Sequence, residues 1–155
     1  MTPPDAATLL LGSLIGALPA DATEVLTMIE NSDADSPAAV EVLKATRVAL
    51  SEAPATYGPA SVLDVLLRRG ARPEVRKVLL DASTVGAAST PGALRIYAAA
   101  VVALAYRRRL ESIGRALIEA ADSGPEAALT GQLDAAVAAV HRIGKRLVQL
   151  RGDVP

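Results

Sequence analysis

The side chains that could do chemistry are few, and each lacks the partners that catalysis requires. The single histidine, His141, stands between Val140 and Arg142 with no metal-ligand side chain nearby, and a lone helical histidine is more often solvated or packed than catalytic. The chain has no cysteine, which excludes disulfides, thiolate metal sites and a cysteine nucleophile. No serine stands in a G-x-S-x-G elbow. The sequence therefore predicts no catalytic, cofactor-binding or metal-binding residue, and a protein that is not an enzyme.

A phosphate-binding loop is the other motif to consider, because Gly144 is followed by Lys145. The G-x-x-x-x-G-K-[ST] motif requires a glycine and a hydroxyl residue at positions that Ala139 and Arg146 hold here. The motif also follows a strand, whereas the surrounding apolar spacing is helical. We therefore exclude this motif.

Three consecutive arginines, Arg107 to Arg109, form the most conspicuous run of charge. Consecutive helical residues are about 100° apart, so the three cannot share one face. A solvated collar that pairs with Glu111 is the first interpretation. Contact with nucleic-acid phosphates is the alternative, although no aromatic side chains are interleaved for stacking on bases. The candidate nucleic-acid contacts are Arg107, Arg108, Arg109, Arg115, Arg142, Lys145 and Arg146.

Length and composition favour one helical domain. The 155 residues are 51% hydrophobic but only 2% aromatic, and alanine and leucine favour helices whereas strands prefer β-branched and aromatic residues. The formal net charge of -1 gives no strong field toward nucleic acid or an anionic membrane. The part before Arg95 is mildly acidic and the part after it mildly basic, which is too weak for a nucleic-acid footprint.

The chain carries no clear targeting signal. The apolar stretch 6–18 follows Asp5, and no lysine or arginine precedes it, so the basic start of a signal peptide is missing. The apolar run near Tyr97 is interrupted by arginines before it reaches the ~20 residues of a membrane span. We expect a cytoplasmic protein with no membrane partner.

Local signals place the helix boundaries. Ser36-Pro37 predicts an N-cap followed by proline at the first helical position, and Thr90-Pro91 predicts the start of the longest helix. Asp21, three residues before Glu24, predicts a capped start for the second helix. Gly70, after two arginines, predicts a glycine C-cap. The longest predicted helix covers about residues 91–121.

Gly124-Pro125 predicts a turn, after which a second long helix must fold back antiparallel on the first. The predicted fold is all-α: residues 1–90 form a head of four or five short helices, 91–150 a long antiparallel helical hairpin continuous with it, and 151–155 a tail. This hairpin is longer than the head, so one chain cannot cover all of its apolar seam, and something else is expected to cover the rest. The same 3-4 spacing also serves packing within the hairpin, and both uses remain open.

Two segments carry a resemblance to a known family. Residues 61–70, S-V-L-D-V-L-L-R-R-G, are similar to a T-L-x-x-x-L-x-x-R-G helix end, and Tyr97-Ala98 through Val101 to Arg108-Arg109-Leu110 is similar to a Y-A-x-x-V…R-R-L stretch. With these, residues 8–145 resemble the N-terminal domain of the bacterial replicative DNA helicases (DnaB type). The resemblance implies a non-catalytic domain that dimerises through its hairpin and contacts helicase, primase or loader proteins. Carried over by position, it implies these interface candidates: Leu110, Ile113, Leu117, Leu133, Val137 and Val140.

The chain departs from that family at three places. Ala34-Asp35 stands where an aromatic pair is usual, and Arg72-Pro73-Glu74-Val75 replaces a glycine pair. The ATPase domain has no counterpart within the 155 residues, so no helicase activity is predicted. A stand-alone relative and a piece of a larger protein both fit. The expected assembly is a homodimer or a higher homo-oligomer.

Overall fold

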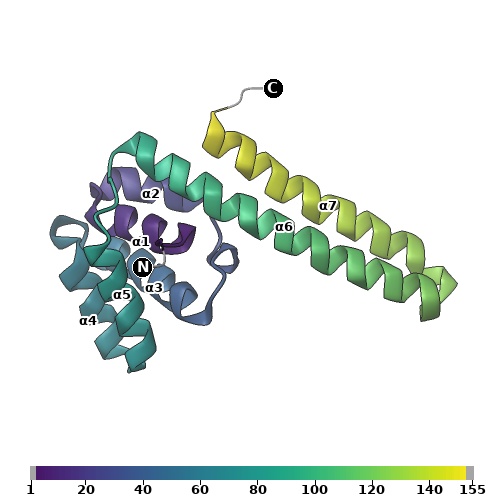
Figure 1. The fold of residues 1–155 in the computed structure, drawn as a ribbon, viewed down its shortest axis with the longest axis horizontal. Helices are drawn as coiled ribbons and strands as arrows, with labels where there is room; N and C mark the ends of the chain where they lie inside the picture. Colours follow the sequence, from purple (N-terminus) through teal and green to yellow (C-terminus); the bar gives the residue numbers. More distant parts are fainter. Residues whose placement is uncertain (1–2, 153–155) are drawn as a thin grey trace.

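The computed structural model describes residues 3–152, and every regular element among them is helical. The predicted all-α class is therefore confirmed. Figure 1 shows the short helices gathered at one end and two long helices extending from them. The elements are α1 (Ala6–Gly16), α2 (Pro19–Met28), the 3-10 turn η1 (Asn31–Asp33), α3 (Pro37–Glu52), the 3-10 turn η2 (Pro54–Thr56), α4 (Pro59–Arg68), α5 (Pro73–Thr84), α6 (Pro91–Ser123) and α7 (Glu126–Arg151).

Local sequence explains most helix ends. The Ser36 side chain accepts a hydrogen bond from the N–H of Ala39, which caps α3 as predicted. The Thr90 side chain accepts from the N–H of Ala93 and caps α6 in the same way. Gly70 follows α4 with φ +68°, a conformation that glycine adopts without steric cost.

The predicted start of the second helix is wrong. Helix α2 begins at Pro19 after an N-cap at Leu18, and Asp21 lies inside its first turn. Proline at the first helical position has no N–H to leave unpaired, so Pro19 ends the approach from α1 and also begins α2.

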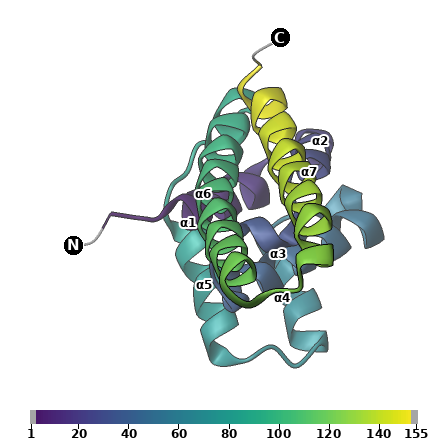
Figure 2. The same ribbon diagram turned by 90° about the vertical axis from the view of Figure 1, so that its right-hand side faces the viewer.

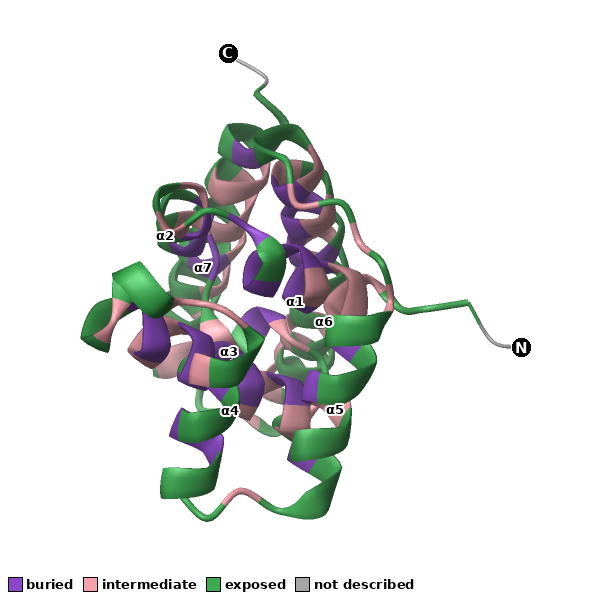
Figure 3. Ribbon diagram, turned by 90° about the vertical axis from the view of Figure 1, so that its left-hand side faces the viewer, coloured by how far each residue is buried: buried purple, intermediate pink, exposed green. Residues whose placement is uncertain are grey.

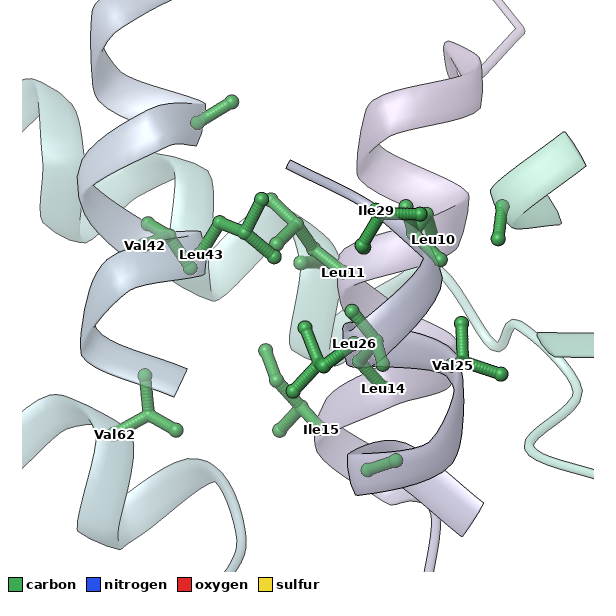
Figure 4. Close-up of a cluster of buried hydrophobic side chains, with 14 of the residues drawn as sticks. Leu10, Leu11, Leu14, Ile15, Val25, Leu26, Ile29, Val42, Leu43 and Val62 are labelled. Atoms are coloured by element: carbon green, nitrogen blue, oxygen red, sulfur yellow. The ribbon is translucent and has the colours of Figure 1, made fainter. Parts of the chain in front are cut away.

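Helix α1 lies at the centre of the head and packs against α3, α5 and α6. Leu14 is fully buried, and Figure 4 shows it among the aliphatic side chains of neighbouring helices. Figure 3 shows the same pattern over the whole head, with buried residues on the inward faces. At Gly12 the helices approach so closely that a Cβ would lie 2.5 Å from the Ala82 carbonyl oxygen of α5.

One tyrosine joins the end of α1 to the segment before α4. The Tyr57 hydroxyl donates to the Leu14 carbonyl oxygen at 2.7 Å. Burial of the ring raises the pKa of the Tyr57 hydroxyl above its ordinary value, so the neutral donor is the form that the fold favours.

The first part of α6 belongs to the core of the head, because Leu94, Ala98 and Val102 are fully buried. Helix α7 contributes Leu150, near its C-terminal end, to the same core. Between these two parts, no residue from 103 to 142 belongs to that core. Figures 1 and 2 show α6 and α7 side by side, and Figure 1 shows them projecting away from the short helices.

Helix α7 continues through Arg151 and ends at Gly152, which has φ +72°. Residues 153–155 of the predicted tail, like residues 1–2 of the predicted head, lie outside the described part of the chain. No helix of residues 3–152 is long and apolar enough to cross a membrane.

Candidate functional site

The six predicted interface side chains all lie on the projecting part of α6 and α7, here called the hairpin tip (residues 110–140). They divide by exposure. Leu110, Leu133 and Val137 are 41%, 51% and 46% exposed, whereas Ile113, Leu117 and Val140 are partly buried.

A cleft of about 540 Å³ runs between the two helices of the tip. Ile113 and Leu117 line it from α6, and Ala135, Ala136 and Ala139 line it from α7. These two candidates therefore face the partner helix of their own hairpin, so intrachain packing accounts for at least part of their burial. The small alanine side chains on α7 leave the space between the helices unfilled.

One apolar residue of the tip was not among the predicted interface residues. Ile118 is 73% exposed, the highest value among the exposed large hydrophobic side chains described. It follows Leu110 and Gly114 at intervals of four, which puts the three on one side of α6. Leu133 and Val137 on α7 are exposed as well, and none of Leu110, Ile118, Leu133 and Val137 lines the cleft.

The basic candidates differ in their surroundings, and Arg146 is paired within the fold. Its guanidinium Nη1 and Nη2 lie 2.5 Å and 3.2 Å from the two carboxylate oxygens of Asp33. The Arg146 side chain is 15% exposed and the Asp33 side chain 4% exposed. This buried two-pronged pair ties α7 to η1, so Arg146 is not free to contact nucleic acid.

Arg108 also turns toward the head. Its Nη2 donates to the Asp33 main-chain oxygen at 2.6 Å. The predicted pairing of the arginine run with Glu111 does not occur, because Glu111 instead accepts from Arg115, four residues later on the same helix. Arg107 and Arg109 are exposed and make no ion pair within residues 3–152.

Arg47, which the sequence analysis did not single out, also holds the segment around η1. Its guanidinium donates to the Asn31 side chain and to the main-chain oxygens of Leu26 and Ile29, at 2.6–2.9 Å. Desolvation lowers the pKa of this guanidinium, and the charge of Asp33 acts in the opposite direction. No local spacing reveals these contacts, since the partners precede Arg47 by 16 to 21 positions.

A second cavity, of about 320 Å³, lies where the hairpin meets η1. Arg109 and Arg142 line it from α6 and α7, whereas Arg107, Arg115 and Lys145 do not. Arg142 and Lys145 are exposed, as is His141. Within residues 3–152, no group of three or more acidic or histidine side chains is placed to hold a metal ion.

No protein-family model, curated protein or solved structure matches this chain.

Proposed function

We propose that this chain is a non-catalytic, cytoplasmic protein–protein interaction module, a head and helical hairpin resembling the N-terminal domain of the replicative helicases. In this proposal it self-associates through the hairpin tip and contacts DNA-replication proteins, namely a helicase, a primase or a loader. The observation that carries the proposal is the exposed apolar group Leu110, Ile118, Leu133 and Val137, at 41–73% exposure. Large exposed apolar patches commonly mark interaction sites, and these four side chains all lie on the tip.

The tip suits association because it lies away from the core that holds the fold together. Its side chains are absent from the buried cluster of the head. Paired helices usually bury such aliphatic stripes against a second helix pair. A second copy would bring an identical stripe, so a twofold arrangement would be self-complementary.

The first experiment is absolute mass by light scattering after size exclusion, over a wide concentration range. The unaltered chain is expected to be a dimer or higher oligomer, and Leu133→Asp with Val137→Asp to give a monomer of unchanged helical content. Both side chains are about half exposed, so the charges need not enter the fold. Leu80→Asp on α5, at 62% exposure, is the matched control and should leave the oligomer intact. A strictly monomeric unaltered chain would contradict self-association.

Partner contact needs a separate measurement. A purified replicative helicase, primase or loader should be titrated against the labelled chain, with the Leu133→Asp, Val137→Asp variant alongside. Saturable binding to one of the three would support the replication role. Self-association without binding to any of them would leave an interaction module with another partner class.

A nucleic-acid-binding regulator is the second candidate, favoured by the exposure of Arg107, Arg109, Arg115, Arg142 and Lys145. Arg146 no longer supports it. Binding through these side chains would weaken steeply as salt rises, because phosphate contacts release condensed counterions. Absent or salt-independent binding to an oligonucleotide would exclude this candidate.

A further inference from the structure

The cavity at the junction of hairpin and head is lined in part by arginines from both long helices. Its volume is about 320 Å³, near the lower end of the range of small-ligand sites. The charged lining residues are Arg108 and Arg109 from α6, Arg142 and Arg146 from α7, and Glu30 and Asp33 from the segment around η1.

Part of this charge is already used by the fold. The Asp33 carboxylate accepts from Arg146 and from the Glu30 main-chain N–H, and Arg108 donates to the Asp33 carbonyl oxygen. These contacts build one wall of the cavity. The formal charge of the lining still favours the arginines, four against two carboxylates.

Arg109 and Arg142 supply the remaining positive charge. Both are exposed, and neither has a hydrogen-bond or ion-pair partner among the side chains of residues 3–152. Arg68, Arg95 and Arg115 each pair with a carboxylate, whereas other exposed arginines of residues 3–152, such as Arg107, make no ion pair. Arg109 and Arg142 differ from these arginines because they come from different helices and line the same cavity.

We propose that this cavity is a binding site for the phosphoryl group of a small anionic ligand, held between Arg109 and Arg142. A guanidinium presents N–H donors in a fork that matches phosphate oxygens, and the Ser112 hydroxyl also lines the cavity as a further donor. The alanine-lined cleft of the tip shares Arg109 and Ala139 with this cavity. An ester group on the phosphate therefore has an adjoining apolar surface to occupy.

Calorimetric titration of the full chain with inorganic phosphate, at constant ionic strength set with sodium chloride, tests the site. The Arg109→Gln, Arg142→Gln variant is expected to bind phosphate at least about ten-fold more weakly, because it loses both charge-assisted donors. The matched control is Arg107→Gln, Lys145→Gln. It also removes one exposed charge from each helix, but neither side chain lines the cavity, so its affinity should stay within about two-fold.

Titration with adenosine monophosphate separates the two sources of the group. Equal affinity for the nucleotide and for phosphate assigns the site to the phosphoryl group alone, whereas about ten-fold tighter nucleotide binding assigns it to a phosphate ester. No binding up to about 10 mM phosphate would overturn the proposal. So would an equal loss in the control variant, which indicates general attraction of anions to the surface. The site does not require self-association, so a monomer that binds phosphate would separate this inference from the proposed function.

Discussion

Asp33 accepts hydrogen bonds from the main-chain N–H of Glu30, three residues earlier, and from the guanidinium of Arg146, 113 positions later. Its carbonyl oxygen accepts from a third part, Arg108 on α6. With only 3% of the residue exposed, water cannot replace these donors or the charge. Removing one member of such a buried pair leaves the other charge without compensation.

We therefore expect Asp33→Ala to lower the free energy of unfolding by about 3 kcal/mol, measured by urea denaturation. Asp35→Ala removes an exposed carboxylate two residues away and should change it by less than about 0.5 kcal/mol. Adding Arg146→Met to Asp33→Ala should recover part of the loss, because the uncompensated guanidinium is gone. Equal, small effects at Asp33 and Asp35 would mean that the pair contributes little.

The helices themselves were largely predictable because their signals are local. Ser36-Pro37 and Thr90-Pro91 fix a helix start within two residues, through a side-chain cap and a ring that already has helical φ. Gly70 ends a helix for an equally local reason. Asp21 misled because an acidic residue suits both an N-cap and the first turn, and only the path of the chain distinguishes the two.

The candidate site was less predictable, since its decisive contacts are long-range. Arg146 has the sequence context of an exposed basic residue, and its partner Asp33 lies 113 positions away. Arg47 lies on α3 with no neighbouring charge run to attract attention. Apolar spacing identified the tip residues but could not distinguish Ile113 and Leu117, which line the cleft, from Leu133 and Val137 outside it.

Two glycine-to-alanine substitutions test how closely the helices pack. At Gly12 in α1 the new Cβ would lie 2.5 Å from a backbone oxygen of α5, so Gly12→Ala should cost about 1–3 kcal/mol. Gly131 in α7 has nothing within 4 Å of its Cβ position, so Gly131→Ala should stabilise by about 0.5–1 kcal/mol. Thermal unfolding of both variants measures the two signs, and the same sign at both positions would contradict the close approach of α1 and α5.

On the scale of the whole molecule, the hydrophobic core and the candidate surfaces occupy different places. The core contains residues from each of the helices α1 through α5, from the first part of α6 and from the end of α7. The exposed apolar side chains of the tip and the arginine-lined cavity lie outside it. Substitution of the exposed side chains of the tip, or of Arg109 and Arg142 at the cavity, should therefore alter binding while the head keeps its fold.

Because the tip residues lie outside the core, the tip should open more often than the head unfolds. Opening of α6 and α7 beyond the arginine contacts exposes no buried residue of the head, so it requires less free energy than global unfolding. In hydrogen exchange of a dilute sample, amides of residues 110–140 should exchange well before those of α1 and α3. Uniform protection along α6, from Leu94 to Ile118, would mean that the hairpin opens only with the whole chain. The expected gradient in exchange would mean that the two halves of α6 open independently, each with its own free energy of opening.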